Sequence, residues 1–357
     1  MPILAIDYLR HSVCRRLFTA AGASEEEADA VGARLVESNL LGHDSHGVIR
    51  IPQYLAAMAD GGVRPGAPLE ITRETSASAV IDGHWGFGQV IASKAAAIAA
   101  SKARSGGVAA VTVRNSYHIG RLGSYVEQLA GDGLLAILMA NAHGTGPCVV
   151  PWGGAQGRLS TSPLAVGIPT TSESLRGAMV LDMTTSSVAE GKVRVKRNRG
   201  ESVPDGWIQD AEGRPTNDPE SLYATPRGSI LPFGGGGAHK GYGLNVVVDL
   251  LAGALSGAGT TGAPDAQHGN AFFLLVLDLF QFIPADDYYQ MVDGLVSFVK
   301  SSAPLAGFKE VLVPGEVEAR EREKREKQGL YVEEETWRQI HSCAESLGVS
   351  LKNGSSG

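Results

Sequence analysis

The middle of the chain alternates short runs of β-forming residues with runs that have helical spacing, and this alternation restricts the folds it can adopt. The β-rich runs are residues 78–81, 108–113, 134–139, 179–183 and 272–279. Between them, residues 90–103 and 124–129 place helix-forming residues at helical spacing. Such chains form layers in which helices cover a sheet. The pattern therefore predicts an α/β fold.

Both ends of the chain are predicted to be helical. Ser24 and Glu27 match a capping box ahead of an apolar face with helical spacing, and Gly42 ends that helix. Further helices are expected at residues 241–255, 285–301 and 334–347. The expected parts of the chain are a helical N-terminal domain with a histidine loop (1–68), an α/β domain (69–280), a C-terminal helical segment that packs against the N-terminal domain (281–350) and a disordered tail (351–357).

Composition and charge exclude several classes of protein. With 357 residues, 43% of them hydrophobic, the chain can bury one large core or several smaller ones. Its formal net charge of -7 disfavours nucleic acid and membrane surfaces as partners. Cys14, Cys148 and Cys343 are too widely separated to suggest a disulfide framework or a thiolate zinc site, so we expect a cytoplasmic protein. The longest apolar stretch, residues 271–283, is too short for a transmembrane helix.

The densest group of reactive side chains is GHDSHGVIR, residues 42–50. An imidazole such as His46 can exchange a proton with a substrate oxygen, because its intrinsic pKa lies near neutral pH. Arg50 can bind a carboxylate through two parallel hydrogen bonds. The same pattern is also compatible with a helix cap at Asp44 or Ser45 beside solvent-exposed histidines.

Two other interpretations of this loop stay open from the residues alone. A metal-dependent hydrolase or lyase would use His43, Asp44 and His46, although no further ligand spacing supports a metal site. The second interpretation is a protein that binds a small molecule and has no catalytic activity.

Two glycine-containing loops are candidates for binding a phosphate. NSYHIGRLGSY (115–125) follows a strand and opens a helix, where backbone amides bind phosphate and Arg121 adds positive charge. A glycine turn beside a surface arginine explains it equally well. In LPFGGGGAHKGYGL (231–244), four glycines precede His239 and Lys240. Because consecutive glycines carry a high entropy cost, a loop that wraps a phosphate or ribose explains them better than a plain connector.

Asp182 ends the apolar run VLDMTTS, so it either caps the next segment or lies at the edge of the sheet where ligands bind. The single GxGxxG match, residues 257–262, follows a helix instead of a strand and lacks the context for dinucleotide binding. The residues alone indicate an α/β enzyme with several ligand loops and a histidine acid or base, without identifying the reaction.

Taken together, these segments resemble the malate/L-lactate dehydrogenase superfamily, a group of NAD(P)-dependent oxidoreductases that lack the Rossmann fold. The resemblance spans nearly the whole chain. Its landmarks are GHDSHGVIRIPQY, NSYHIGRLGSY, RLSTSPLAVGIP, VLDMTTSSVAEGK, HKGYGL, ALSGAGTT and VPGEVEARERE. Among the members of the group, these motifs are most similar to the hydroxycarboxylate dehydrogenases.

The resemblance implies a fold, an activity and a partner. The implied fold is a three-layer α/β/α arrangement with a mixed seven-stranded sheet and a helical domain drawn from both chain termini, assembled as a homodimer. The implied activity is the NAD(P)-dependent interconversion of a small 2-hydroxy acid and its 2-keto acid. Ureidoglycolate dehydrogenase and piperideine-2-carboxylate reductase, from the same superfamily, are the alternatives. NAD is the expected cofactor, with NADP as the alternative, and no metal is implied.

The resemblance also implies roles for individual residues. His46 would donate a proton to the C2 carbonyl in reduction and accept it in oxidation, with Ser45 as its hydrogen-bond partner. Arg50 would hold the substrate carboxylate, His118 would lie near the same pocket, and Asp182 near the nicotinamide. The implied cofactor contacts are His46, Gly120, Arg121, Leu122, Leu181, Asp182, Met183, Thr184, Thr185, His239, Lys240, Asn270, Gly315, Glu316, Val317 and Glu318.

The chain departs from the family pattern at two places. Where the family usually has a Gly-Thr-Asn-Pro turn, residues 160–163 read Ser-Thr-Ser-Pro, so a shorter hydroxyl replaces the asparagine amide. The glycine loop at residues 234–237 also contains more glycines than is usual, so its path over the cofactor is expected to differ.

Overall fold

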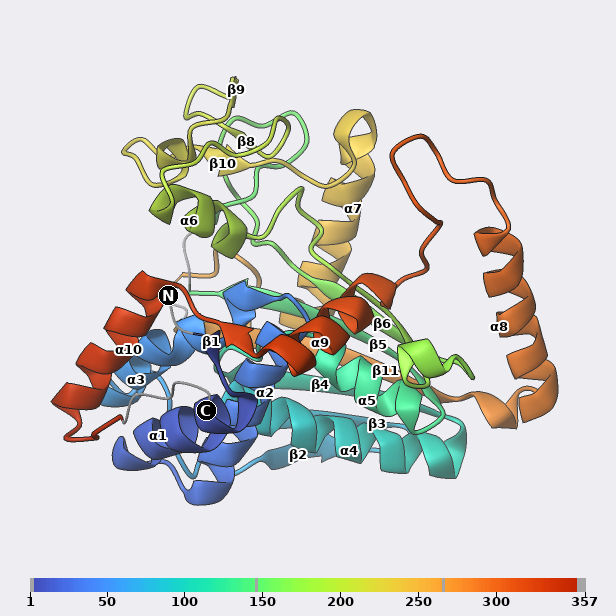
Figure 1. Cartoon of the computed structure of the whole chain (residues 1–357). Helices are drawn as coiled ribbons and strands as arrows, with labels where there is room; N and C mark the ends of the chain where they lie inside the picture. The colour runs from blue at the N-terminus through green and yellow to red at the C-terminus, as the bar shows by residue number, and fades with distance from the viewer. Residues whose placement is uncertain (1–2, 145–146, 265–266, 352–357) are drawn as a thin grey trace.

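The computed structural model describes residues 3–144, 147–264 and 267–351, and a mixed seven-stranded sheet lies at its centre (Figure 1). In spatial order the strands are β2 (Glu70–Glu74), β3 (Ser78–Gly86), β4 (Val108–Ser116), β11 (Gly269–Asp278), β5 (Leu134–His143), β6 (Leu164–Pro169) and β7 (Ala178–Met183). β3 and β4 run parallel, and the other neighbours pair antiparallel. The α/β fold with a mixed seven-stranded sheet is confirmed.

Five of these strands contain a run predicted from β-forming residues, and two were missed. β2 has the sequence EITRE and is exposed along its whole length at the edge of the sheet, so it lacks apolar alternation. β6 is short and is bounded by Pro163 and Pro169, a pattern typical of a loop. Both strands are therefore specified by their neighbours more than by their own sequences.

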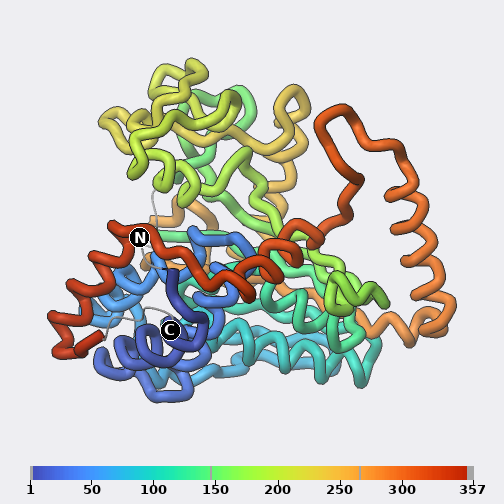
Figure 2. The backbone as a smooth tube through the Cα atoms, viewed as in Figure 1, coloured from blue at the N-terminus to red at the C-terminus, as the bar shows by residue number. Residues whose placement is uncertain are grey.

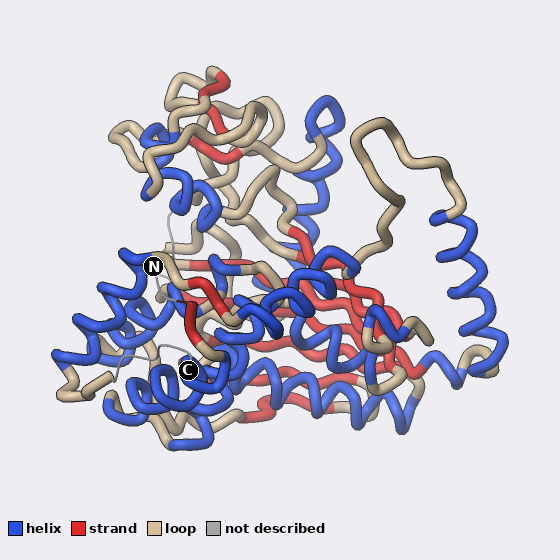
Figure 3. The backbone as a smooth tube through the Cα atoms, viewed as in Figure 1, coloured by secondary structure: helices blue, strands red, loops and turns tan. Residues whose placement is uncertain are grey.

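Helices lie against both faces of the sheet (Figure 3). On one face, α4 (Gly88–Gly106) and α5 (Gly123–Gly131) pack on the main core. α4 can approach the sheet closely because its buried face contains five alanines, whose side chains are small. They are Ala92, Ala95, Ala96, Ala99 and Ala103. On the other face, α7 (Ala238–Asp249) continues into η7 (Leu250–Ala254), which contacts β5 and β11.

Helices from both ends of the chain share a second core. They are η1 (Tyr8–Arg15), α1 (Arg16–Ala20), α2 (Glu25–Leu40), α3 (Ile51–Ala59) and α10 (Glu334–Ser346). β1 (Ile3–Leu4) pairs with β12 (Leu330–Tyr331), so the first and last parts of the chain lie side by side (Figure 2). The predicted capping box is present at the start of α2, where Ser24 Oγ accepts a hydrogen bond from the Glu27 amide at 3.2 Å.

A third, small core lies inside the segment that the sequence analysis assigned to the α/β domain. We call this part the small lobe, residues 147–159 and 187–232. It contains the sheet β10 (Ser229–Ile230), β8 (Ile208–Gln209) and β9 (Pro215–Thr216), together with α6 (Glu190–Asn198). Strands of two residues carry no periodic signal, so the sequence did not separate the lobe from the large sheet.

The C-terminal segment divides into helices with different surroundings. α9 (Glu316–Gln328) packs against α2, and α10 packs against α3. α8 (Ala285–Lys300) has no buried residue and projects outward from the molecule (Figures 1 and 3). It is joined to the end of β6 by polar contacts, such as the bond from Thr171 Oγ1 to Asp293 at 2.8 Å. The predicted tail falls on residues 351–357, of which 352–357 lie outside the described residues. Within the described part of the chain, no helix is both long and apolar enough to cross a membrane.

Gly167 in β6 allows a test of how α5 packs on the sheet. A Cβ atom at Gly167 would lie 2.1 Å from the carbonyl oxygen of Val126 in α5, a backbone atom that cannot rotate away. We expect Gly167→Ala to lower the free energy of unfolding by about 1–3 kcal/mol, the usual cost of overpacking a core. Gly131→Ala, at the exposed end of the same helix, meets nothing within 4 Å and should change stability little. Equal urea midpoints for the two variants would contradict this packing.

Candidate functional site

A cavity of about 520 Å³ lies where the helical domain, the large sheet and the small lobe meet. The loop between α2 and α3 contributes His46 and Arg50, the loop after β4 contributes His118, and β11 contributes Asn270. The small lobe completes the wall with residues from α6 and from the segment before β10. Segments far apart in sequence, including two of the motifs singled out above, therefore converge on one cavity.

Two histidines stack inside this cavity. The rings of His46 and His118 have centroids 5.6 Å apart and an interplanar angle of 10°. Ser45 Oγ lies 3.2 Å from His46 Nδ1, and the Tyr54 hydroxyl lies 2.7 Å from His118 Nδ1. Because Gln89 Nε2 donates to the Tyr54 hydroxyl at 2.7 Å, this hydroxyl is free to donate to Nδ1 of His118, an arrangement that favours the proton of the neutral ring at Nε2.

Both histidines are held in the neutral form. Burial lowers the pKa of His46 to about 3, and the positive charge of Arg50 contributes to the shift. Burial and the same charge lower the pKa of His118 well below its usual value. A neutral imidazole at pH 7 is a proton acceptor, which is the form a general base requires.

Arg50 is a half-buried cation without an ion-pair partner among the described residues. Its Nε donates to the Ser45 carbonyl at 2.7 Å and its Nη1 donates to Gln53 Oε1 at 2.7 Å. Among the described residues it forms no ion pair, and burial lowers its pKa. A guanidinium in these surroundings can bind an anion. Its remaining N–H groups are partly shielded from water and no carboxylate pairs with them.

Asn270 supports the cavity from the sheet. Its Oδ1 accepts a hydrogen bond from the Ile119 amide at 3.0 Å, and its Nδ2 donates to the Asn141 carbonyl at 2.8 Å. The first bond fixes the loop that carries His118. Asn270 therefore contributes to the position of the histidine pair as well as to the cavity wall.

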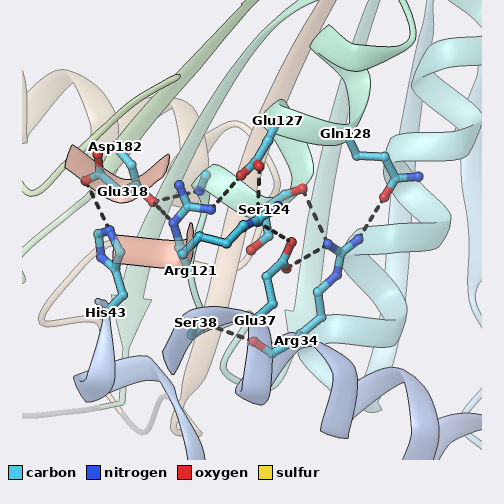
Figure 4. Close-up of polar contacts among 12 residues, drawn as sticks. Arg34, Glu37, Ser38, His43, Arg121, Ser124, Glu127, Gln128, Asp182 and Glu318 are labelled. Carbon is cyan, nitrogen blue, oxygen red and sulfur yellow. Dashed lines mark hydrogen bonds and ion pairs between the residues drawn. The ribbon is translucent and has the colours of Figure 1, made fainter. Parts of the chain in front are cut away.

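Other segments singled out in the sequence gather along β7, an edge strand of the sheet. Asp182 Oδ2 accepts a hydrogen bond from the Gly123 amide at 2.8 Å and lies 3.4 Å from Arg121 Nε (Figure 4). Arg121 also pairs with Glu127 at 3.0 Å, and its side chain is only 2% exposed. The guanidinium thus lies between two carboxylates, and Asp182 ties the start of α5 to the sheet edge.

The segment before α9 and the histidine loop reach the same edge. A Cβ atom at Gly315 would lie 3.2 Å from the amide nitrogen of Val180 in β7. Glu318, one turn into α9, lies 3.4 Å from His43 Nε2, and this contact lowers the pKa of the carboxyl (Figure 4). The start of α9 therefore lies beside β7 at Val180.

The start of α7 also lies near β7, because Phe233, which precedes the helix, is hydrogen-bonded to Thr185. The Phe233 amide donates to the Thr185 carbonyl at 3.0 Å, and Phe233 lies against Gly241 in the first turn of α7. His239 and Lys240, in the same turn, are both exposed. Leu181 and Phe233 also expose apolar surface, 38% and 51%. Ligand sites typically combine apolar surface with a few polar groups, as this edge does.

The Ser-Thr-Ser turn that departs from the family pattern borders the cavity. Ser160 and Thr161 line it, and Ser160 Oγ lies 2.9 Å from Ser162 Oγ. Ser162 has a φ of 33° and is fully buried. Glycine and asparagine adopt positive φ more easily than serine, so the turn keeps a conformation suited to the asparagine it lacks.

The contacts of the histidine loop bear on two of the other interpretations, a helix cap at Asp44 and a metal site. Asp44 makes no helix-capping hydrogen bond; its carboxylate accepts from Asn39 at 2.7 Å and pairs with Arg325 at 2.6 Å. His43 faces Glu318, whereas His46 faces His118, so these side chains do not converge on one point. Within the described ranges, no three His, Cys, Asp or Glu residues form a group that could hold a metal ion.

Several cavity residues were missed in the sequence. They are Gln53, Glu190, Arg194, Tyr223, Arg227 and His268 in the wall, and behind the wall Tyr54 and Gln89, which support His118. Gln53, Tyr54 and Glu190 lie within motifs quoted above, but nothing in those motifs pointed to a role for them. The others come from helix faces or irregular segments without a motif, so no local signal marked them.

The histidine pair should make stability depend on pH. The pKa of His46 is lower in the folded chain than in the unfolded chain, so its stabilising effect is complete above about pH 6.5 and is lost as the pH falls towards 3. Between pH 7 and 5 this loss is at most about 2 kcal/mol, because solvent in the open cavity reduces it. Urea denaturation of His46→Asn should show a weaker pH dependence than the parent.

His11→Asn is the matched control, because the His11 side chain is 49% exposed and lies outside the cavity. It should keep the parental dependence. If His46→Asn and the parent lose the same stability between pH 7 and 5, His46 is not held neutral by the fold.

Comparison with known proteins identifies the family of the chain. The model of the malate/L-lactate dehydrogenase family matches residues 7–341. The L-sulfolactate dehydrogenase of Methanothermobacter thermautotrophicus is 35% identical over 95% of this chain and 96% of its own length. Hydroxycarboxylate dehydrogenase B of Escherichia coli is also 35% identical, over 95% of this chain and 93% of its own length.

A solved structure gives the same result. The malate dehydrogenase of Pyrococcus horikoshii is 31% identical and superposes with a TM-score of 0.87, covering 98% of this chain and 96% of that one. Family match, sequence identity and fold thus agree over nearly the full length. The chain belongs to the malate/L-lactate dehydrogenase family of oxidoreductases.

Proposed function

We propose that this dehydrogenase interconverts a small 2-hydroxy acid and its 2-keto acid, with NAD as cofactor, in the cytoplasm, where its three free cysteines stay reduced. One observation carries the proposal: Arg50, a half-buried cation without an ion-pair partner among the described residues, lines the same cavity as the neutral pair His46 and His118. A carboxylate site beside a proton acceptor suits an acid whose adjacent hydroxyl is oxidised. The sulfolactate and hydroxycarboxylate dehydrogenases among its relatives are named for substrates of this class.

The edge of β7 is the proposed cofactor site. Leu181 and Val317 expose 38% and 61% of their surface, which an aromatic ring can cover, and Lys240 offers an exposed cation to a phosphate. The remaining assigned contacts are His46, Gly120, Arg121, Leu122, Asp182, Met183, Thr184, Thr185, His239, Asn270, Gly315, Glu316 and Glu318. Arg121 is enclosed by carboxylates, so its proposed part is to hold Asp182. NAD is preferred to NADP on the resemblance to hydroxycarboxylate dehydrogenases.

Each of three cavity residues has a separate role in the proposed reaction. Arg50 binds the C1 carboxylate of the substrate and so fixes the position of C2 beside His46. The cofactor, when bound, would supply the hydride chemistry. His46 takes the proton of the C2 hydroxyl in oxidation and returns it in reduction, with Ser45 on its other ring nitrogen. A carboxylate on Arg50 cancels the charge that helps to lower the pKa of His46, so substrate binding makes His46 easier to protonate.

Replacement of His46 tests this mechanism. His46→Asn should lower turnover about 100-fold to 10,000-fold, the usual contribution of a general acid or base. The assay is the oxidation of NADH and NADPH at 340 nm against a panel of 2-keto acids, with His11→Asn as the control that keeps parental activity. Full activity of His46→Asn would remove His46 from the reaction.

The same panel separates the other members of the family. Turnover of a cyclic imine or of ureidoglycolate alone would move the substrate to the piperideine-2-carboxylate reductase or ureidoglycolate dehydrogenase branch. Faster oxidation of NADPH than NADH would change the proposed cofactor.

We also propose that the chain works as a homodimer. The second face of the sheet carries apolar residues that stay only half-buried in one chain, among them Ile137, Met139 and Leu275. On α8, Met291 and Phe298 are 66% and 77% exposed. A helix without buried residues and a half-covered sheet face expose more apolar surface than single chains usually keep in water. A second copy of the chain would cover both, as the family resemblance implies.

Replacement of Phe298 tests the dimer. Light scattering on the parent should give twice the chain mass of 37.3 kDa. Phe298→Glu should shift the particle towards one chain mass, because a charge at the centre of an apolar contact is costly to bury. Tyr331→Glu, an exposed residue outside α8, is the control and should stay dimeric. A parent of single-chain mass would contradict the proposal.

A further inference from the structure

The cavity contains a second arginine that the proposed reaction does not use. Arg227 lines it together with Arg50. Nε of Arg227 donates to the Leu222 carbonyl at 2.7 Å, which leaves both terminal nitrogens available. Among the described residues, Arg227 forms no ion pair with a carboxylate. It is therefore a cation that faces the cavity without an acidic partner.

Arg194, the third arginine of the cavity wall, differs in this respect. Its Nη2 lies 2.9 Å from both carboxylate oxygens of Glu190. The Tyr223 hydroxyl donates to the same carboxylate at 2.8 Å. The charge of Arg194 is thus balanced by Glu190, and the positive charges left in the cavity are those of Arg50 and Arg227, since His46 is neutral.

The two unbalanced arginines enter the cavity from different parts of the fold. Arg50 belongs to the helical domain and borders the start of α6, where a Cβ atom at Gly191 would lie 3.7 Å from its Nη2. Arg227 belongs to the small lobe, on the segment whose Tyr223 bonds Glu190. Glu190 and Gly191, at the start of α6, line the same cavity as both cations. A molecule with an anionic group at each end is suited to pair with both.

We propose that the substrate is a dianion, a 2-keto or 2-hydroxy acid with a second anionic group at its far end, and that Arg227 binds this second group. The inference rests on the proposed function, in which Arg50 binds the C1 carboxylate. A second carboxylate and a sulfonate share the required chemistry, because either oxygen cluster can accept hydrogen bonds from a guanidinium. Arg227 is exposed at the cavity wall, so a monoanionic acid would gain only the contact with Arg50 and should bind more weakly than an acid that pairs with both arginines.

Keto acids of matched size test the proposal. Oxaloacetate and 3-sulfopyruvate carry the second anion, and 2-oxobutyrate has the four-carbon chain of oxaloacetate without it. The parent should reduce one of the dianions with a kcat/KM at least about 10-fold above that for 2-oxobutyrate, since hydrogen bonds to charged groups contribute this much or more. A preference for oxaloacetate identifies a carboxylate, and one for 3-sulfopyruvate a sulfonate.

Variants of Arg227 assign the effect to this residue. Arg227→Gln should lower kcat/KM for the preferred dianion about 10-fold to 100-fold, chiefly through KM, and leave 2-oxobutyrate nearly unchanged. Arg227→Lys, which keeps the charge, should restore part of the loss. Arg214→Gln is the matched control, because Arg214 is an exposed arginine of the same lobe outside the cavity and pairs with Asp210.

The outcomes separate this inference from the function on which it rests. Equal kcat/KM values for 2-oxobutyrate and both dianions, or an equal loss on all substrates in Arg227→Gln, would overturn the role of Arg227 while the dehydrogenase remains active. The absence of NADH and NADPH oxidation with every keto acid would overturn the proposed function and this inference with it.

Discussion

Arg50 carries a positive charge into the wall of the cavity with only neutral acceptors, the Ser45 carbonyl and the Gln53 side chain, to share it. Partial burial of a cation that has no anionic partner carries a desolvation cost, which the rest of the fold must offset. The charge also acts on its surroundings, because it helps to keep His46 and His118 unprotonated. An anion that binds Arg50 removes both penalties at once. The charge proposed to bind the acid therefore adds to the effect of burial, which is the larger cause of the neutral state of both histidines.

The position of the histidine pair depends on how the helical domain packs against the sheet. Tyr54 of α3 is fully buried and bonds both Gln89 of α4 and His118 from the loop after β4. Its ring lies 6.3 Å from Phe18 and 5.5 Å from Tyr117, within the core shared by the two chain ends. One side chain therefore belongs both to the core and to the support of the site. A change in the packing of the terminal helices would move His118.

The sequence predicted the parts of this site that are local. GHDSHGVIR brings His46 and Arg50 to the cavity because a single short loop carries them, and the β-forming runs located five strands of the sheet. The surroundings of Arg121 could not be predicted, since its carboxylate partners are Glu127 and the distant Asp182. The wall of the small lobe was missed for a related reason: two-residue strands and turns have no period, and their place is set by contacts such as that of Tyr223 with Glu190. Nor could the outward position of α8 be predicted, because its apolar residues have the spacing of a buried helix.

The arrangement of the ligand loops follows from the sheet. In a doubly wound parallel sheet, loops meet in a crevice beside the ends of parallel strands. Here only one pair of neighbouring strands in the seven-stranded sheet is parallel, so such a crevice is not formed. The loops are instead joined along β7 by individual contacts, among them the bond from the Gly123 amide to Asp182 and the bond from the Phe233 amide to Thr185.

Individual contacts of this kind hold the three parts of the fold together more weakly than a shared core would. The small lobe has its own core, separate from that of the helical domain. The cations assigned to the substrate lie one on each, Arg50 on the helical domain and Arg227 on the small lobe. A substrate with an anion at each end would contact both parts and so stabilise the arrangement in which His46 faces C2. An acid with one anion would bind the helical domain and leave the lobe unconstrained. Selectivity for a dianion would then depend on the closing of the cavity as well as on the charge of Arg227.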